Sequence, residues 1–202
     1  MIEMKARLQV GEFRLYAELQ GGGTICLAGK NGTGKTTTLR AIAGLLPIAD
    51  GFVRLGGKDI TKSPVEERDV VLVTPTTCIQ HLGVDSHLIW GARLKGIRPQ
   101  REYVSQVKSE LGIDYGGTVG KLSRGMRQRV ALATALLSSP RAILVDEAFL
   151  GLNDREAFVA AYGRLAKQAE IDLIFSSQDE DDGNLADRLY VLSNGLATLR
   201  QG

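Results

Sequence analysis

The sequence predicts an α/β fold with a largely parallel sheet, an N-terminal antiparallel β subdomain and a small helical subdomain. Short, continuously apolar runs alternate with segments whose apolar residues recur at helical spacing. Such runs are typical of parallel strands that are covered on both faces. The first twenty residues instead alternate apolar and polar side chains, as strands with one buried face do. From about residue 76 to 121 the chain offers two helical patterns. We therefore expect one domain over residues 1–202, with the helical subdomain inserted at approximately 76–121.

The elements are expected in a regular order along the chain. Residues 1–20 predict two antiparallel strands, and three glycines at 21–23 turn the chain into the next strand. The later strands are expected at Thr24–Ala28, 51–60 with a glycine turn, Val70–Val73, Ala142–Val145, 173–175, and 189–192 with 196–199 as a hairpin around Asn194 and Gly195. The helices are expected to include 39–46, 84–95, 100–111, 126–137 and 158–169.

Composition limits the classes of protein that fit. The chain has 202 residues, of which 44% are hydrophobic, and no apolar run approaches the ~20 residues of a membrane span. The first five residues lack the apolar region of a signal peptide. A net charge of +2 gives no electrostatic footprint for nucleic acid. Of the two cysteines, Cys26 lies in an expected core strand and suits a small apolar role. We expect a cytoplasmic protein that does not bind nucleic acid.

A glycine-rich run follows the expected strand Thr24–Ala28 and precedes an expected helix. It reads Gly29-Lys30-Asn31-Gly32-Thr33-Gly34-Lys35-Thr36-Thr37. Its glycines permit backbone angles closed to other residues, so successive N–H groups can curl around a β-phosphate at a helix start. Lys35 would reach the β- and γ-phosphates, and the Thr36 hydroxyl would hold a magnesium ion. The run therefore predicts a triphosphate site.

Two carboxylates follow the expected strand Ala142–Val145. Asp146 and Glu147 stand at the carboxyl end of this strand, where open α/β sheets place ligands. Asp146 can hold the magnesium ion through water, and Glu147 can polarise an attacking water. Phosphoryl transfer depends mainly on positioning and charge neutralisation. We expect Thr36 and Asp146 as metal residues, and Lys35 and Glu147 as catalytic residues.

Three segments together carry a family resemblance. Residues 29–37 resemble a Walker A motif, and residues 143–147 resemble a Walker B motif with its catalytic glutamate. The segment between them resembles the signature of ATP-binding cassette (ABC) proteins; it reads Leu122-Ser123-Arg124-Gly125-Met126-Arg127-Gln128-Arg129. The order of the motifs, the helical insert, and Asp187 with Arg188 before the closing hairpin also match. Over nearly the entire chain the sequence resembles an ABC ATPase subunit, which implies a P-loop NTPase core that binds ATP and Mg²⁺.

The resemblance implies partners and a function. Two such domains would pair head-to-tail, as a homodimer or a heterodimer, so that ATP on one meets Ser123 and Gly125 of the other. The implied activity is ATP hydrolysis that powers transport through a separate membrane permease, docked on the helical subdomain around residues 76–87. The protein would lie peripherally at the inner face of the cell membrane. Two questions stay open: import or export, and whether the chain instead serves a soluble complex, such as cofactor assembly, as a nucleotide-gated scaffold.

Four positions depart from the family pattern. Pro75 stands where a glutamine is expected, and Asn153 stands where an aspartate is usual. Gln178 replaces the switch histidine; its amide can hydrogen-bond a γ-phosphate but does not titrate near neutrality. We count Gln178 among the catalytic candidates. Arg124 replaces a glycine of the signature. These departures predict an ATP binder that hydrolyses slowly or that a partner completes.

Aromatic and histidine residues leave further alternatives. Phe13 and Tyr16 are both candidates for the side chain that stacks on adenine. His81 and His87 are expected as surface or packing residues, because no cysteine or carboxylate pattern supports a metal site around them.

Overall fold

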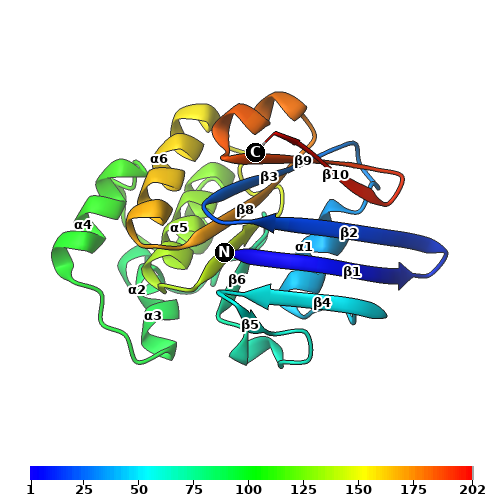
Figure 1. Ribbon diagram of the computed structural model, residues 1–202. Helices are drawn as coiled ribbons and strands as arrows, with labels where there is room; N and C mark the ends of the chain where they lie inside the picture. Colours follow the sequence, from blue (N-terminus) through cyan, green and yellow to red (C-terminus); the bar gives the residue numbers. More distant parts are fainter. Residues whose placement is uncertain (202) are drawn as a thin grey trace.

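A computed structural model describes residues 1–201 and confirms the α/β class. A single sheet runs through the molecule and carries helices on both faces (Figure 1). Its strands are β1 (Ile2–Val10), β2 (Phe13–Gly21), β3 (Thr24–Ala28), β4 (Asp50–Leu55), β5 (Lys58–Asp59), β6 (Val70–Val73), β7 (Ala142–Val145), β8 (Asp172–Ser177), β9 (Arg188–Ser193) and β10 (Leu196–Gln201). Within residues 1–201 their spatial order is β5-β4-β1-β2-β10-β9-β3-β8-β7-β6.

The parallel and antiparallel parts are continuous with each other. Strands β6, β7, β8, β3 and β9 pair in parallel and form one end of the sheet, with β6 at its edge. Strands β5, β4, β1 and β2 pair in antiparallel fashion and form the other end. The two parts meet at β10, which pairs with β9 as a hairpin and with β2 through Leu196 and Tyr16. The predicted N-terminal strands and closing hairpin are confirmed.

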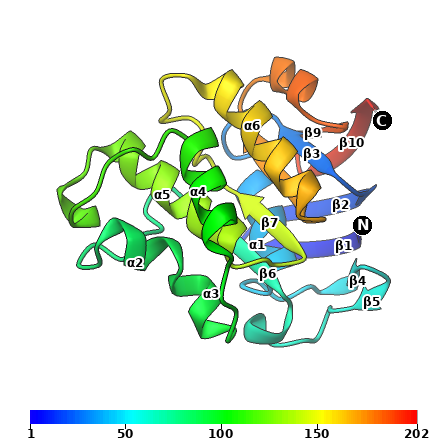
Figure 2. The ribbon, with the colours of Figure 1, turned by 90° about the vertical axis from the view of Figure 1, so that its left-hand side faces the viewer.

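The helices divide between the two faces of the sheet. They are α1 (Lys35–Ala43), α2 (Val84–Leu88), α3 (Trp90–Leu94), α4 (Arg101–Glu110), α5 (Arg124–Leu137) and α6 (Arg155–Gln168), with short 3-10 turns η1 (Val65–Glu67), η2 (Val119–Lys121) and η3 (Glu180–Leu185). Alternate residues of β7 show the division: Ile143 and Val145 pack with α5 and α6, whereas Ala142 and Leu144 pack with α1. Figure 2 shows α5 and α6 in front of the strands. Burial on both faces explains the continuous apolar runs.

One predicted helix was wrong in its extent. Residues 84–95 were expected as a single helix, but the structure divides them into α2 and α3. Ile89 separates the two with φ −98° and ψ 1°, outside helical geometry. The break coincides with close packing on α5, since a Cβ added to Gly91 would lie 3.0 Å from the Ser138 Cβ. The helical spacing of this segment therefore predicted two short helices as one.

The helical segment lies between β6 and α5. Its helices α2, α3 and α4 gather on the left of Figure 1, beside α5. Val84, Leu88 and Val107 are buried in the same apolar core as α5 and α6. In the described part of the chain, none of the helices combines the length and apolar character that crossing a membrane requires.

Candidate functional site

The glycine-rich loop connects β3 to α1 at the carboxyl edge of the parallel strands. Gly29 and Gly34 have φ of 148° and 110°, angles that favour glycine. A Cβ at Gly29 would lie 2.4 Å from the Leu192 carbonyl oxygen, so the backbone approaches too closely for any other residue. The Gly29 N–H donates to the Ser177 carbonyl oxygen at 3.1 Å. The loop is therefore fixed to the end of β8.

Lys35 lies inside this loop and is 5% exposed. Its Nζ donates to the carbonyl oxygens of Gly29 at 2.6 Å and Lys30 at 2.9 Å. Burial lowers the pKa of Lys35, and the nearby carboxylates of Glu147 and Asp146 partly oppose this shift. The structure thus gathers one ammonium group and two carboxylates around the loop.

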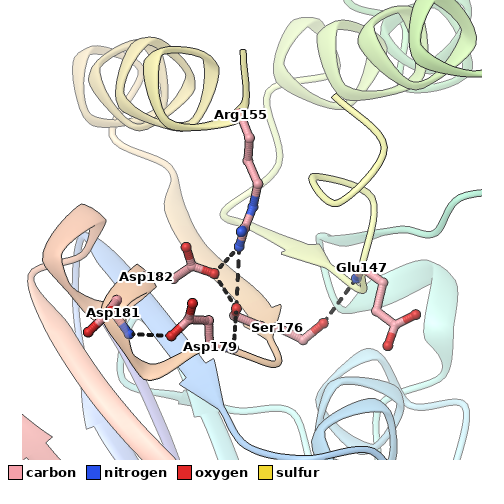
Figure 3. Close-up of polar contacts among 7 residues, drawn as sticks. Glu147, Arg155, Ser176, Asp179, Asp181 and Asp182 are labelled. Carbon is pink, nitrogen blue, oxygen red and sulfur yellow. Dashed lines mark hydrogen bonds and ion pairs between the residues drawn. The ribbon is translucent and has the colours of Figure 1, made fainter. Parts of the chain in front are cut away.

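A chain of hydrogen bonds joins the loop to the two carboxylate residues. Thr36 Oγ1 and Ser176 Oγ both donate to Asp146 Oδ1, at 3.1 and 3.0 Å. Ser176 Oγ also accepts from the Glu147 N–H at 3.0 Å, a contact drawn in Figure 3. Glu147 adopts φ 57°, an uncommon conformation for a residue other than glycine. Lys35, Thr36, Asp146 and Glu147 are thus brought together as expected, and their roles stay predictions.

Glu147 shares an open hollow of about 370 Å³ with Lys35, Thr36 and Thr37. Ser176 was not predicted from the sequence. It is the penultimate residue of a buried strand, and only the pairing of β7 with β8 places it beside Asp146. The sequence carried no signal for Ser176, because it is 30 residues from Asp146 along the chain.

The segment that carries Gln178 follows β8 directly. Gln178 itself is exposed, between Ser177 and Asp179. Ser177 Oγ contacts the Asp182 carboxylate, and Arg155 contacts both of them (Figure 3). The sequence analysis did not single out Arg155 or Asp182, because they are 27 residues apart and lie outside the motifs.

The signature residues lie away from the loop. Ser123 is the N-cap of α5, and its Oγ accepts from the Met126 N–H at 3.3 Å. Ser123 is exposed and Gly125 is half-buried, and neither lines the hollows beside the phosphate loop. Asn153 is exposed in the turn before α6. Within residues 1–201 the structure does not bring these three residues to Lys35.

Pro75 occupies a tight turn after β6. The Thr77 N–H donates to the Thr74 carbonyl oxygen at 3.0 Å, which places proline at the second turn position that its fixed φ suits. The Thr74 N–H donates to Thr77 Oγ1 at 2.9 Å. Gln80 is exposed, and its carbonyl oxygen accepts from the Gly120 N–H at 2.8 Å. The hydrogen bonds of the Pro75 turn thus join residues within the turn. Gln80, the next glutamine along the chain, is instead bonded to η2.

The two candidates for the adenine-stacking residue, Phe13 and Tyr16, lie in different surroundings. Phe13 is half-buried, and a Cβ added to Gly34 would lie 3.2 Å from its Cζ. Phe13 lines both hollows beside the phosphate loop, of about 720 and 370 Å³. Tyr16 faces a different hollow, where its hydroxyl donates to Glu18 at 2.9 Å and Arg7 lies over its ring. Phe13 is therefore the aromatic side chain that adjoins the loop.

The oxygen donors at the loop fit a magnesium ion. Magnesium is held by one or two protein oxygens together with waters and phosphates. Thr36 Oγ1 and Asp146 Oδ1 lie 3.1 Å apart and supply such a pair. Among residues 1–201 there is no cluster of three or more histidine, cysteine or acidic side chains that would favour a different metal.

Comparison with known families agrees with this geometry. The family model described as ABC transporter matches residues 14–150. The chain therefore belongs to the ABC transporter family, whose ATP-binding proteins are ATPases in general.

Curated relatives match most of this chain. It is 34% identical to the spermidine/putrescine import ATP-binding protein PotA of Thermobifida fusca, covering 88% of this chain and 48% of the relative. It is 34% identical to the molybdenum import ATP-binding protein ModC of Bordetella pertussis, with coverage of 97% and 57%. It is 33% identical to the sulfate/thiosulfate import ATP-binding protein CysA of Nocardia farcinica, with coverage of 94% and 61%. The chain thus spans about half to three-fifths of the length of these relatives.

Solved structures share the fold. The cbiO1 protein from Clostridium perfringens, described as part of the ABC transporter complex cbiONQ, superposes with a TM-score of 0.82 at 20% identity. That match covers 98% of this chain and 86% of the other. An ATP-binding cassette of an ABC transporter in its ADP conformation gives a TM-score of 0.79 at 24% identity, with coverage of 100% and 91%.

Proposed function

We propose that this chain is the ATP-binding and ATP-hydrolysing subunit of an ABC transporter and powers transport through a separate membrane permease. The observation that carries the proposal is the hydrogen-bonded unit of Thr36, Asp146, Ser176 and Glu147 beside Lys35. Segments far apart in sequence meet there at the edge of the sheet where α/β proteins bind ligands. The names of the relatives, which are import ATP-binding proteins, support the same function.

Each residue of the unit has a proposed role toward ATP. The N–H groups of residues 29–37 and the Lys35 ammonium bind the phosphates, with Lys35 exchanging its loop carbonyl contacts for phosphate oxygens. Magnesium, held by Thr36 and through water by Asp146, would supply charge neutralisation on the phosphates. Glu147 orients and polarises the attacking water. Phe13, beside Gly34, is the proposed adenine-stacking residue.

A second copy or a related ATPase completes the site in this proposal. Ser123 and Gly125 stand at the exposed start of α5, where a helix N-terminus favours an anion. Because they lie away from the phosphate loop of their own chain, we propose that they contact ATP bound to the partner. The dimer is therefore expected to form with ATP bound between the two chains.

The helical subdomain, approximately residues 76–121, is the proposed permease-docking part. Next to residues 76–87 lies an open hollow of about 1040 Å³. The charged residues that line it are Asp85, Arg93, Arg98, Arg101 and Lys108. Because cations predominate, we propose that the docked permease segment carries carboxylates. Such docking would place the chain at the inner face of the membrane.

Hydrolysis is proposed to be slow in the isolated chain. Pro75, Asn153 and Gln178 all depart from the family pattern, and we propose that the loop carrying each of them faces a γ-phosphate in the dimer. Misplacement of one group can lower a rate severely when catalysis depends on positioning.

The test is to measure ATP hydrolysis by the purified chain alone and after reconstitution with a co-purified permease. We expect low activity alone and stimulation in the complex, with Asp146→Asn inactive in both. A chain that does not bind Mg²⁺·ATP in a calorimetric titration would contradict the proposed function. Full ATPase activity without any partner would contradict only the proposal that the isolated chain hydrolyses ATP slowly.

A further inference from the structure

Arg155 connects the start of α6 to the segment that carries Gln178. It is the first residue of α6 and follows the exposed Asn153 by two positions. Its Nη2 contacts the Asp182 carboxylate in η3 and donates to Ser177 Oγ at 3.3 Å. Figure 3 shows the side chain of Arg155 extending from α6 toward Asp182. One side chain thus bridges three segments of the chain.

The contacts pin the backbone on both sides of Gln178. Before it, the Ser177 carbonyl oxygen accepts from the Gly29 N–H at 3.1 Å, which joins it to the phosphate loop. After it, the Asp179 N–H donates to Ser177 Oγ at 3.0 Å. The same Oγ donates to the Asp182 carboxylate. Gln178 is therefore an exposed residue between two fixed neighbours.

Arg155 neutralises the buried carboxylate of this segment. Asp182 is 7% exposed, and a buried carboxylate needs a charged partner or its burial is strongly unfavourable. In the described part of the chain Arg155 is the cation paired with Asp182. Because Asp182 and Ser177 both contact it, Arg155 ties residues 177–182 to the start of α6.

The start of α6 is also fixed to the signature helix. Asp154, the neighbour of Arg155, forms an ion pair with Arg129 of α5. Arg129 further donates to the Leu111 carbonyl oxygen at 2.7 Å and lies 5.0 Å from the centre of the Phe158 ring. Asp154 and Arg155 thus join α5 on one side to the Gln178 segment on the other.

We propose that Arg155 is a positioning residue for Gln178: it holds the backbone of Gln178 against the phosphate loop, so that the glutamine amide reaches the γ-phosphate, and it links that position to the signature helix. This inference rests on the proposed function. A neutral amide has no charge to guide it to a phosphate, so its contact depends on where the backbone places it.

Nucleotide discrimination is the decisive measurement, because a γ-phosphate contact strengthens binding of ATP and leaves ADP unaffected. Titration calorimetry is carried out in a Glu147→Gln background so that ATP is not consumed. We expect Gln178→Ala to weaken ATP binding about 2- to 10-fold, the range of one hydrogen bond, with ADP binding unchanged. Arg155→Met should produce the same ATP-specific loss. Combining the two changes should produce no further loss, since Arg155 acts through Gln178.

A matched set of variants controls for folding. Arg155→Met leaves Asp182 without its partner, so Arg155→Met/Asp182→Leu removes both charges together and should show the same ATP-specific loss. Arg164→Met removes an arginine of the same helix that is 64% exposed and forms only a long ion pair with Glu110, at 3.9 Å. It should bind both nucleotides as the parent does.

Hydrogen exchange supplies a readout without nucleotide. The Asp179 N–H is bonded to Ser177 Oγ, so its exchange should accelerate in the Arg155 variants and stay unchanged in Arg164→Met. Unchanged exchange at Asp179 would overturn the proposal. Equal losses of ATP and ADP affinity, or additive losses in the double variant, would also overturn it while leaving the proposed function intact. A parent that binds neither nucleotide would overturn the proposed function itself.

Discussion

The phosphate loop and the segment around Gln178 flank the same edge of the sheet, yet they are built differently. In the first, Lys35 is buried, and Thr36 is bonded to Asp146 within the site. In the second, Gln178 is exposed, and its position is set from outside by contacts to neighbouring residues. The phosphate-loop half of the site is fixed by its own residues, and the Gln178 half is fixed by contacts to α6 and η3.

This difference between the phosphate loop and the Gln178 segment indicates which substitutions should affect ATP binding and which should affect ATP hydrolysis. A loop whose lysine is buried and bonded to the loop's own carbonyl oxygens is expected to bind phosphates independently of a partner chain. A segment placed by α6 responds to anything that moves α6 or α5, and a dimer partner that meets Ser123 would act on α5. We therefore expect changes in the phosphate loop to affect affinity, and changes around Gln178 to affect the discrimination and the use of the γ-phosphate.

The largest expected effect separates chemistry from binding. Glu147→Gln should lower ATP hydrolysis about 10²- to 10⁴-fold, the range for removing a group that activates water, while ATP binding is retained. With ATP and magnesium, gel filtration should then show a trapped dimer. Glu12→Gln, an exposed acid at the larger hollow, is a charge-matched comparison that should still hydrolyse ATP. Turnover by Glu147→Gln at the parent rate would mean that another group activates the water.

The next effect tests the self-bonded loop. Lys35→Ala removes a charged contact to phosphate, and such bonds contribute about 1.5–3 kcal/mol, so ATP affinity should fall about 10- to 100-fold. Calorimetric titration measures it, with Lys62→Ala, an exposed lysine elsewhere in the chain, as the matched control. If Lys35→Ala binds ATP like the parent, the phosphate loop does not determine ATP affinity through Lys35, and the distinction drawn between the two halves of the site is wrong.

The same contrast explains what the sequence could predict. Walker A, the strand that precedes it and the carboxylates of Asp146 and Glu147 are local patterns, and the structure places them in one unit as expected. Ser176 and Arg155 could not be found in this way, because their roles depend on strand pairing and on contacts between distant segments. The alternation of apolar and polar residues was also sufficient to predict the two N-terminal strands. Each strand buries one face, so its sequence has a clear period of two residues.

Helix 84–95 shows where local spacing fails. Its apolar residues fit a helical period, but the backbone leaves helical geometry at Ile89, which divides it into α2 and α3. The spacing of residues also cannot establish the predicted site roles of Ser123, Gly125 and Gln178. They depend on a second chain or on bound nucleotide, neither of which is encoded in the spacing of the residues.

A third prediction concerns His87 of α2, which bonds to the loop after β6, and it is sensitive to pH. His87 is buried; its Nε2 accepts from the Ile79 N–H at 3.0 Å, and its Nδ1 pairs with Thr134 Oγ1 at 2.8 Å. Burial lowers the pKa of His87, so the folded protein favours the neutral ring that this acceptor requires. The unfolded chain then binds more protons, and the His87 contribution to stability is complete above about pH 6.5 and is lost as the pH falls.

Denaturant unfolding at pH values above and below about 6.5 measures this contribution. His87→Gln should cost about 1–3 kcal/mol at the higher pH, because it disturbs buried hydrogen bonds, and should reduce the loss of stability on acidification. His81→Gln, at the exposed histidine of the loop that precedes α2, should retain the pH dependence of the parent. An identical pH dependence in the parent and in His87→Gln would exclude His87 as its source.

The smallest expected effect is the restoration of the family residue at the switch. Gln178→His should leave ATPase turnover of the isolated protein within about twofold of the parent, because Pro75 and Asn153 still depart from the pattern and positioning limits phosphoryl transfer. Gln178→His combined with Pro75→Gln serves as the comparison, since it restores two of the three positions. Steady-state rates of the parent and both variants decide the matter. A large gain from Gln178→His alone would show that the missing imidazole limits turnover, and a brisk parent rate would show that Gln178 already suffices.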